Sequence, residues 1–316
     1  MPAPYVPALA RDVGALPAAG ALPGGCAYEP KYDGWRVAVI VPAGGPPRLV
    51  SRHGRRLDAA FPEIAADALR LPAGTVVDGE LIAWRDGALD FPALARRAAS
   101  RGGQPGVGCA VAAFDLLELA GADLRPLPYD ERRRRLTDLL DPTGRGGGLV
   151  SAVPMTTDPA TAAEWFDALV RLGVEGLVVK GRAEPYRAGA RCWLKVKHRT
   201  TRELVVGATT GPPRAPVLVL GAVAGARLRV VGRTTVLGAA TAAAVWPRLS
   251  PAGAGHPWPA ELPARALGAF ARGGAPGPVP IRRVVPDLTV EVVADTACDH
   301  GRYRHALRLL RVRDDP

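Results

Sequence analysis

The sequence predicts two domains, a mixed α+β domain over the first two thirds of the chain and a smaller, mainly β domain after it. In the first part, short runs rich in β-branched residues alternate with segments whose apolar residues recur at helical spacing. From about residue 200, strand-like runs follow one another across Gly and Pro turns. A chain of 316 residues is also long enough for two domains with separate cores. We therefore place the domains at residues 1–199 and 200–316, with the boundary near Thr200.

The first domain is expected to alternate strands and helices. The predicted strands are Trp35–Val41, Arg48–Ser51, Thr75–Trp84, Cys109–Leu119, Gly176–Lys180 and Trp193–Lys197. The predicted helices are Pro92–Ser100, Asp130–Leu140 and Asp158–Leu172. The second helix contains the run Arg132–Arg135, which is typical of a solvated helix end, with a phosphate-facing surface as the alternative.

The second domain is expected to form a small barrel. Its predicted strands are Glu203–Thr209, Val217–Val223, Arg227–Val231 and Thr289–Ala294, with one helix over Ala239–Leu249. Successive strands with a single inserted helix suit a five-stranded barrel. The segment Ser250–Pro280 is rich in Pro, Gly and Ala, and it is expected to be an ordered excursion or a flexible loop.

The charge composition separates lysine from arginine. Lys and Arg total 41 against 30 Asp and Glu, which gives a net charge of +11. The lysines among these cations are Lys31, Lys180, Lys195 and Lys197. We expect arginine wherever any surface cation suffices, and lysine where arginine cannot replace it. The positive excess favours a polyanionic partner, of which nucleic acid is the commonest.

Several classes of protein are disfavoured. The N-terminal residues lack the basic stretch and apolar run of a secretory signal, and the longest apolar run, Ala215–Ala226, is too short to span a bilayer as a helix. We therefore expect a cytoplasmic protein with no membrane association. The cysteines have no Cys-x-x-Cys spacing, which argues against a zinc ribbon or a disulfide framework. They are Cys26, Cys109, Cys192 and Cys298.

Lys31 is the candidate nucleophile. In the segment EPKYDGWR, Glu29–Arg36, Pro30 and Gly34 predict a bend that presents this lysine on a loop entering a strand. An ordinary lysine, with a pKa of about 10.4, carries the free amine in only about 1 in 2,500 molecules at pH 7. Neighbouring cations disfavour the charged form, so they lower the pKa of the lysine and increase the fraction of free amine. Arginine cannot serve here, because it does not deprotonate.

A cationic neighbourhood is available in WLKVK, Trp193–Lys197. Side chains alternate along a strand, so Lys195 and Lys197 should share one face while the residues between them face the core. Two ammonium groups can hold nucleotide phosphates and depress the pKa of a third lysine. The alternative interpretation is an ordinary amphipathic strand with an exposed basic face.

Carboxylates and one aromatic residue complete the candidate site. Asp78 and Glu80 share a strand face in VVDGELI, and Glu175 precedes a glycine and a buried strand in VEGLVVK. Carboxylates at strand ends are suitable oxygen ligands for Mg²⁺, although each alone is more often a turn or edge residue. Phe114 is by default a core aromatic, but beside a nucleotide site it can stack on a base.

Taken together, these motifs resemble the ATP-dependent DNA ligases of the covalent nucleotidyltransferase superfamily. The sequence is most similar to the compact bacterial ligases related to the ligase module of end-joining repair enzymes, and the resemblance covers nearly the whole chain. It implies an α+β nucleotidyltransferase domain of the ATP-grasp-like adenylation class, followed by an all-β OB-fold domain. The motifs are KxDGxR (Lys31–Arg36), SRxGR (Ser51–Arg55), DGE (Asp78–Glu80), FDLL (Phe114–Leu117), EGLVVK (Glu175–Lys180) and WLKVK (Trp193–Lys197).

The resemblance implies a reaction centred on Lys31. This lysine would attack the α-phosphate of ATP, forming a lysyl-adenylate and releasing pyrophosphate. Glu29 would help select adenine, and Phe114 would stack on the base. AMP would then pass to the 5′-phosphate of a DNA nick, and the 3′-hydroxyl would displace it. Arg36 and Arg52 would contact the nucleotide or the 5′-phosphate of the nick.

The resemblance also implies roles for the remaining motif residues. Glu80 would hold the AMP ribose or a metal ion. Glu175 would coordinate the divalent ion, Mg²⁺ or Mn²⁺. Lys195 and Lys197 would bind the α-phosphate, and Lys195 would also assist the leaving group or control a pKa.

The C-terminus departs from the family pattern. The last family motif, Arg-x-Asp-Lys, corresponds to RDDP, Arg313–Pro316, in which the lysine is absent. Because that motif is thought to orient pyrophosphate, we expect the first step to be slower or to be assisted by another cation such as Arg311. The basic residues nearby form a candidate surface for DNA phosphates, with binding that falls steeply with salt and shows little sequence preference. They include Arg302, Arg304 and Arg308.

The resemblance implies a monomer that acts on nicked double-stranded DNA in repair, near the nucleoid, with a bacterial Ku-type end-binding protein as a partner. An RNA ligase or a capping-type nucleotidyltransferase shares the KxDG chemistry and is the alternative within the superfamily. The alternative from another class is a catalytically impaired DNA-end-binding protein that keeps the fold. The missing final lysine is the best argument for it.

Overall fold

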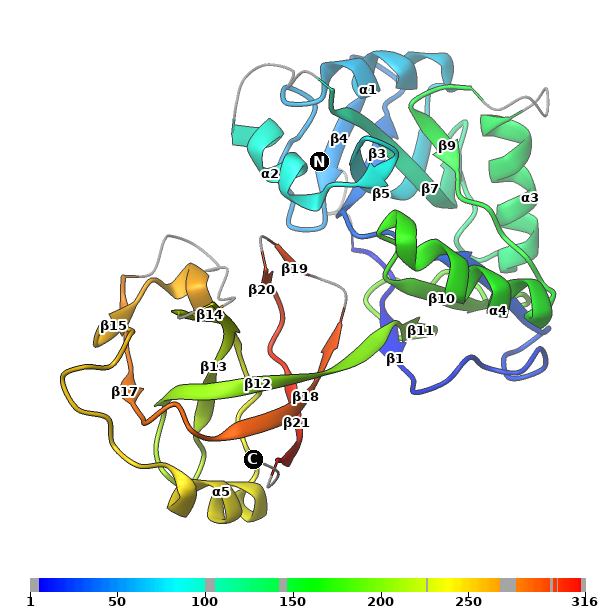
Figure 1. The fold of residues 1–316 in the computed structure, drawn as a ribbon. Coiled ribbons are helices and arrows are strands. Elements are labelled where there is room, and N and C mark those ends of the chain that lie inside the picture. The colour runs from blue at the N-terminus through cyan, green and yellow to red at the C-terminus, as the bar shows by residue number, and fades with distance from the viewer. Residues whose placement is uncertain are drawn as a thin grey trace. The chain divides into compact units, whose positions relative to one another are not determined.

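The computed structural model describes residues 6–99, 106–141, 147–225, 227–267, 277–295, 298–299 and 301–313. The chain divides into two compact units, Met1–His198 and Arg199–Pro316 (Figure 1). Unit 1 combines two sheets with helices, whereas unit 2 consists mainly of strands. Among the described residues, no helix is both long and apolar enough to cross a membrane.

The larger sheet of unit 1 has seven strands. They are β3 (Trp35–Val41), β4 (Arg48–Ser51), β5 (Thr75–Arg85), β6 (Ala88–Leu89), β7 (Gly108–Leu119), β8 (Ala122–Asp123) and β9 (Val150–Ala152). The main path runs β4-β3-β5-β7-β8, while β6 pairs with β5 and β9 pairs with β7. All of these pairs are antiparallel except β7 with β9. Val37 and Val39 of β3 and Val77 and Leu81 of β5 are fully buried, in keeping with the apolar composition of these strands.

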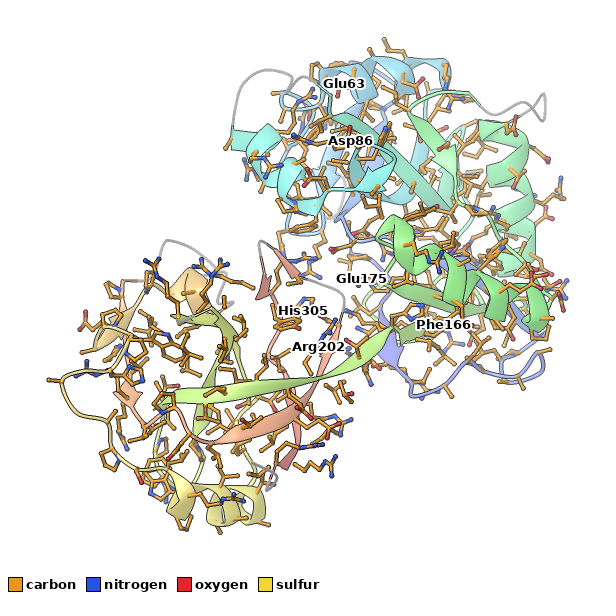
Figure 2. All side chains as sticks on the ribbon, in the orientation of Figure 1. Glu63, Asp86, Phe166, Glu175, Arg202 and His305 are labelled. Carbon is orange, nitrogen blue, oxygen red and sulfur yellow. The ribbon has the colours of Figure 1, made fainter. Side chains whose placement is uncertain are left out.

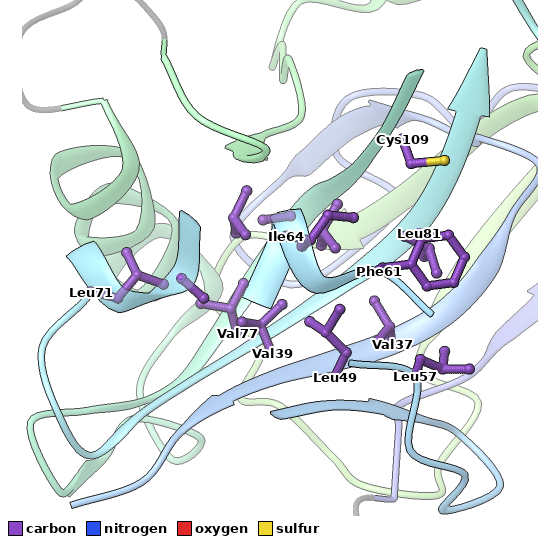
Figure 3. Close-up of a cluster of buried hydrophobic side chains, with 14 of the residues drawn as sticks. Val37, Val39, Leu49, Leu57, Phe61, Ile64, Leu71, Val77, Leu81 and Cys109 are labelled. Atoms are coloured by element: carbon purple, nitrogen blue, oxygen red, sulfur yellow. The ribbon is translucent and has the colours of Figure 1, made fainter. Parts of the chain in front are cut away.

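Three helices pack on the core of this sheet. They are α1 (Pro62–Asp67), α2 (Phe91–Ala99) and α3 (Tyr129–Leu140). Ile64 of α1 joins Val39 and Val77 of the sheet in one buried cluster (Figure 3). Leu94 of α2 and Leu136 of α3 belong to the same cluster. The sequence did not predict α1, because six residues are too few to show helical periodicity.

The run Arg132–Arg135 in α3 is not a solvated helix end. Arg132 is 1% exposed, and its guanidinium donates two hydrogen bonds to the carboxylate of Asp115, at 2.7 and 3.0 Å. Arg133 is buried as well, and its guanidinium donates to a backbone carbonyl. The other two arginines of the run pair with Glu131 near the surface. The expectation was therefore wrong for Arg132 and Arg133, because consecutive helical residues lie about 100° apart around the axis and cannot all face solvent.

The smaller sheet of unit 1 has four strands in the order β1-β11-β10-β2. They are β1 (Ala10–Asp12), β2 (Cys26–Pro30), β10 (Gly176–Gly181) and β11 (Trp193–Lys197). Helix α4 (Pro159–Ala168) packs on one face, where Ala162 contacts a cluster that includes Leu177 and Leu194. The side chain of Asp158 caps this helix by accepting from two backbone N–H groups. The predicted helix continues beyond Ala168 as a 3₁₀ turn, Leu169–Leu172.

The two sheets of unit 1 meet through the other face of the smaller sheet. Trp193 of β11 packs edge-on against Phe114 of β7 and against Tyr186, with ring centroids 5.9 and 5.8 Å apart. Lys195 and Lys197 alternate with the buried residues of β11 and so share the face of Trp193. This confirms the face that the strand pattern predicted for the two lysines.

Unit 2 is a closed sheet. Its strands are β12 (Arg199–Thr210), β13 (Val217–Ala224), β14 (Arg227–Arg233), β17 (Arg282–Arg283), β18 (Thr289–Asp295) and β21 (Arg308–Val312). They pair antiparallel in the order β14-β13-β12-β18-β21, with β17 beside β12. A parallel bridge between Thr234, just after β14, and Leu307, just before β21, joins the two ends of the sheet. This closure gives the predicted small barrel.

The remaining part of unit 2 packs against this barrel. Helix α5 (Ala239–Val245) and a 3₁₀ turn (Trp246–Arg248) occupy the region predicted as one helix. Within the predicted excursion, the described residues form the pair β15 (Glu261–Leu262) and β16 (Val279–Pro280). Trp258 is buried there, and its indole N–H donates to the carbonyl of Leu228 (2.7 Å). The described part is therefore an ordered excursion, and residues 268–276 lie outside it. A short pair, β19 (Cys298–Asp299) and β20 (Arg302–Tyr303), precedes β21.

Candidate active site

Lys31 directly follows β2, and its backbone is tied to the start of β10. The Lys31 N–H donates to the carbonyl of Gly176 (2.8 Å), and the Lys31 carbonyl accepts from the N–H of Glu175 (2.9 Å). Figure 2 labels Glu175 at this end of the smaller sheet. This reciprocal pair of hydrogen bonds brings together two side chains that are 144 residues apart in the sequence.

Two motif glycines allow the close backbone approaches that build the site. Gly176 has a φ of +148°, and a Cβ there would lie 2.0 Å from the carbonyl oxygen of Val196. Gly34 packs equally closely on β5, where a Cβ would lie 2.3 Å from the carbonyl oxygen of Leu81. Any larger residue would force these strands apart. The DG and EG pairs of the motifs are therefore explained by backbone contact.

Lys31, Glu175 and Lys197 form a triad of charges. The Lys31 Nζ lies 2.5 Å from Glu175 Oε2, and the Lys197 Nζ lies 3.1 Å from the same oxygen. Glu175 is 3% exposed, so its charge is compensated by the two ammonium groups rather than by bulk water. Although burial raises the pKa of Glu175, the attraction of Lys31 and Lys197 outweighs it, and the pKa falls below its ordinary value.

The pKa of Lys31 differs from the sequence prediction. Burial is the largest influence and lowers this pKa, but the carboxylates of Glu175 and Glu80 more than offset it, and the pKa is raised above its ordinary value. The expected depression by neighbouring cations is therefore wrong for Lys31. The sequence pattern showed the lysines, but it could not show that a carboxylate lies closer to Lys31 than either of them.

Lys195, and not Lys31, is the lysine near Glu175 whose pKa is lowered. Burial lowers it, and the positive charges of Lys197 and Lys31 lower it further. Lys195 is half-buried and lies opposite Asp12 of β1 in the strand register. Lys31 and Lys197 thus lower the pKa of Lys195, which is the effect that the sequence predicted for Lys31.

Glu80 and Arg36 come from neighbouring strands of the larger sheet. The pKa of Glu80 is raised to about 7, mainly by burial and against the attraction of Lys31 and Arg36. The Arg36 guanidinium binds both carboxylate oxygens of Asp78, at 2.6 and 2.5 Å. It also lies over the Phe114 ring, 4.4 Å from the centroid. Asp78 was noticed in the sequence without a role, and its role here is to hold Arg36.

The predicted adenine-side residues meet in a buried network. Glu29 is 2% exposed, and its oxygens accept from the Tyr129 hydroxyl (2.6 Å) and the Lys180 ammonium (2.8 Å). Lys180 also donates to the backbone carbonyl of Phe114 (2.7 Å). Burial lowers the pKa of Lys180, although the carboxylates of Glu29 and Asp115 oppose this shift. Sequence reasoning missed Tyr129, because no motif marks a residue in a helix 100 positions from its partner.

The predicted DNA-contacting residues lie on the surfaces of both units. Arg52 of unit 1 is exposed, and its backbone N–H donates to the carbonyl of Arg36 (3.2 Å). In unit 2, Arg302 and Arg308 are exposed and Arg304 is half-buried.

The two arginines proposed to orient pyrophosphate make ion pairs within unit 2. Arg311 pairs with Glu291 (2.7 Å), and Arg313 pairs with Glu203 (3.2 Å). Asp314–Pro316, the rest of the RDDP segment, lie outside the described residues.

The carboxylates of the site suit a metal ion that also binds substrate. Within the described ranges, no group of three or more His, Cys, Asp or Glu side chains could hold a metal. Mg²⁺ commonly uses one or two carboxylates together with substrate phosphates. Glu175 and Glu80, which both act on Lys31, provide that donor set.

Comparison with known proteins identifies the family. The family model "ATP dependent DNA ligase domain" matches residues 7–197, which include all six motifs. The chain belongs to the ATP-dependent DNA ligase family. The match confirms the family predicted from the motifs, and it favours a DNA ligase over the RNA-ligase and capping alternatives.

Curated relatives extend this similarity over the whole chain. DNA ligase C2 of Mycolicibacterium smegmatis is 33% identical over 99% of this chain and 91% of the relative. DNA ligase C of Mycobacterium tuberculosis is 36% identical over 64% of this chain and 57% of the relative. A probable DNA ligase of Anaeromyxobacter sp. is 35% identical over 98% of this chain and 58% of the relative. The chain thus spans less than two thirds of the length of several ligases that it matches.

Solved structures confirm the fold class. The ligase domain of M. tuberculosis LigD is 26% identical, with a TM-score of 0.53 over 98% of this chain and 95% of that chain. A mycobacterial DNA ligase D complexed with ATP and MES is also 26% identical, with a TM-score of 0.54 over the same shares. A Lig E DNA ligase has a TM-score of 0.59 at 18% identity, which supports the fold alone. The chain thus has the predicted nucleotidyltransferase and OB-fold architecture.

Proposed function

We propose that this ligase seals nicks in double-stranded DNA by passing AMP from ATP through Lys31. In the first step, the Lys31 ammonium loses a proton to solvent, a P–N bond forms between its Nζ and the α-phosphorus, the bond to the β-phosphate breaks, and pyrophosphate leaves. In the second step, the 5′-phosphate of the nick attacks the adenylate, and the amine of Lys31 is the leaving group. In the third step, the 3′-hydroxyl attacks that 5′-phosphate and releases AMP, which closes the phosphodiester.

The triad of Lys31, Glu175 and Lys197 is the observation that carries this proposal. It holds Lys31, the candidate nucleophile at the end of β2, and the ammonium group of Lys197 on the same oxygen of the Glu175 carboxylate. The side chain of Lys31 is 23% exposed, so it is not sealed off from solvent. Lys195 and Lys197 share a strand face and supply positive charge for a bound triphosphate.

A divalent ion fits the carboxylates beside Lys31. Glu175 and Glu80 would hold Mg²⁺ or Mn²⁺ together with the phosphates of ATP, and such an ion supplies charge neutralisation on the triphosphate. Asp78 fixes the guanidinium of Arg36, and this guanidinium lies over the ring of Phe114. These contacts support a role for Arg36 in positioning Phe114. Glu29 and Phe114 are proposed to select and stack adenine.

Exposed arginines support a DNA footprint on both units. Arg52 in unit 1 and Arg302 and Arg308 in unit 2 can contact backbone phosphates without reading sequence. Arg304 belongs to the same proposed surface, while Arg311 and Arg313 remain the proposed pyrophosphate-orienting cations once their carboxylate partners release them. We place the enzyme in DNA repair in the cytoplasm, near the nucleoid.

A nick-sealing assay tests the substrate and the nucleotide together. A 5′-labelled nicked duplex is incubated with Mg²⁺ and either ATP, GTP or NAD⁺, beside an otherwise identical nicked RNA. The proposal expects sealing of DNA with ATP, and none by the Lys31→Arg variant. Preferential sealing of RNA, or sealing driven by GTP, would contradict it.

Two proposals about partners need separate measurements. We expect a monomer, which light scattering behind a sizing column would measure; a stable dimer would contradict it. We also expect a bacterial Ku-type protein to stimulate end joining by this ligase. No stimulation on blunt or cohesive ends, together with no co-precipitation, would remove that partner.

A further inference from the structure

We propose that Lys180 is a positioning residue that sets the affinity of the ligase for ATP by holding Glu29 and Phe114 in place. The proposal rests on the proposed function, in which these two residues bind the adenine end of ATP. The roles implied by the family resemblance leave Lys180 without a function, although it closes the EGLVVK motif.

Lys180 connects the two sheets of unit 1 at one point. Its ammonium lies 2.8 Å from Glu29 Oε2, on β2 of the smaller sheet, and it donates to the backbone carbonyl of Phe114, on β7 of the larger sheet, at 2.7 Å. Asp115, the next residue on β7, lies 4.0 Å away. A single side chain therefore fixes both predicted adenine-contacting residues, which come from separate sheets.

The surroundings leave the ammonium little freedom. Lys180 is 1% exposed, so water cannot replace its protein partners. Its Nζ lies 4.4 Å from the ring centroid of Trp193, 4.8 Å from that of Phe114 and 5.0 Å from that of Tyr129. Aromatic faces attract a cation, and they also close the space around it. A compact ammonium fits this space, whereas a planar guanidinium has a different shape and different donors.

The Glu29 carboxylate is held from its other side as well. Tyr129 donates to Glu29 Oε1 at 2.6 Å, and Arg133 Nη1 lies 3.6 Å from the same oxygen. With Lys180 on Oε2, the carboxylate cannot rotate without losing a buried partner, which is costly in a site closed to water. The orientation of Glu29 is thus set before ATP arrives, and preorganisation of this kind increases affinity.

A purely structural ion pair is the competing explanation, and it makes a different prediction. Loss of a structural pair lowers the folded fraction, and so it lowers every step of sealing in parallel. Loss of a positioning residue for adenine raises the KM for ATP in the first step. It affects the third step far less on a nick that already carries AMP, because the adenine there is joined to the DNA, and binding of the DNA brings it to the site.

The experiment uses the full chain with Lys180→Met, which keeps the length of the side chain but removes its charge. Arg97→Met is the matched control, because Arg97 is also buried in unit 1 and makes a two-bond ion pair, with Glu63, at 2.9 and 2.8 Å. KM and kcat are measured for adenylation of the enzyme, together with single-turnover sealing of a pre-adenylated nick and the melting temperature. The double variant Lys180→Met/Glu29→Gln removes both buried charges and should recover stability.

We expect Lys180→Met to raise the KM for ATP by at least about 10-fold, with sealing of the pre-adenylated nick within about 2-fold of wild type. The double variant should regain melting temperature but keep the high KM. Parallel losses in all steps, as expected for Arg97→Met, would overturn the positioning role, as would an unchanged KM. If the wild-type ligase forms no adduct with ATP at all, the proposed function itself fails, which is a distinct result.

Discussion

The positive charges of unit 1 and unit 2 differ in residue type and in surroundings. All four lysines lie in unit 1, and unit 2 contains arginine but no lysine. Lys31 and Lys197 share one buried carboxylate, and Lys180 is enclosed by aromatic rings. In unit 2, by contrast, Arg308 is exposed and Arg311 is 63% exposed in its ion pair.

We propose that this contrast reflects two uses of positive charge. A nucleophilic amine must lose a proton, and a compact ammonium can be enclosed in a small buried space, so these positions need lysine. Contact with a polyanionic backbone needs only charge and donors, so arginine suffices. The predictions below test whether unit 1 is specific for residue type and unit 2 is not.

Replacing the shared carboxylate should have the largest effect. Glu175→Gln removes the proposed metal ligand and the charge that holds Lys31, and we expect the rate of adenylation to fall by about 100-fold or more. Because Glu175 raises the pKa of Lys31, the residual rate should rise toward its plateau at a lower pH than in wild type. Rate against pH measures both effects, with exposed Glu164→Gln on α4 as the control. A full rate, or a rise displaced to higher pH, would contradict the assignment.

The glycine at the start of β10 should be the next most sensitive position. Gly176→Ala places a Cβ 2.0 Å from the Val196 carbonyl oxygen at a φ of +148°. We expect the free energy of unfolding to decrease by about 2–4 kcal/mol, measured by urea denaturation. Gly20→Ala is the control, because a Cβ there meets nothing within 4 Å. Equal stabilities of the two variants would show that the pairing of β10 with β11 does not depend on the close packing of Gly176 against Val196.

Glu80→Gln should stabilise the ligand-free protein in a pH-dependent way. The pKa of Glu80 is raised from 4.5 to about 7 in the folded state, so folding favours the protonated carboxyl. Between these pH values, wild type loses stability as pH rises, whereas the Gln variant does not. We expect the variant to be more stable by about 2 kcal/mol above pH 7, with the difference vanishing below about pH 4.5.

Melting temperatures measured across this pH range test that prediction. The exposed Glu261→Gln in unit 2 is the control, and it should show no such trend. A stability difference between Glu80→Gln and wild type that stays constant with pH would refute the raised pKa.

Exchanging residue types between the two units tests the contrast itself. Lys195→Arg keeps a positive charge in unit 1, yet we expect adenylation to slow by about 10-fold, because the guanidinium differs in shape and cannot take a depressed pKa. Arg308→Lys in unit 2 should leave the affinity for nicked DNA within about 2-fold at one salt concentration. Single-turnover adenylation and fluorescence anisotropy measure the two effects. If neither Lys195→Arg nor Arg308→Lys had an effect, unit 1 would be no more specific for residue type than unit 2, which contradicts the proposal.

Local sequence predicted the parts of this structure that depend on local pattern. The face shared by Lys195 and Lys197 follows from strand alternation. The family followed from motif order along the chain. Strand β2 was missed because its five residues are all buried and show no alternation.

The charge environment could not be predicted in the same way. Whether Lys31 lies nearer to Glu175 or to another lysine depends on a contact between residues 144 positions apart. The burial of Arg132 depends on Asp115 in a different element, and no local pattern marks that pair. Sequence therefore identified the groups, and their protonation depends on long-range packing.

The central claim is that Lys31 is a nucleophile and that no other cation can take its place. The most direct measurement is incubation of the full chain with α-labelled ATP and Mg²⁺, followed by denaturing electrophoresis and mapping of the labelled peptide. If Lys31 is the nucleophile, an acid-labile adduct forms on the peptide containing Lys31, and none forms with Lys31→Arg. A label that persists in Lys31→Arg, or that maps to another residue, would contradict it.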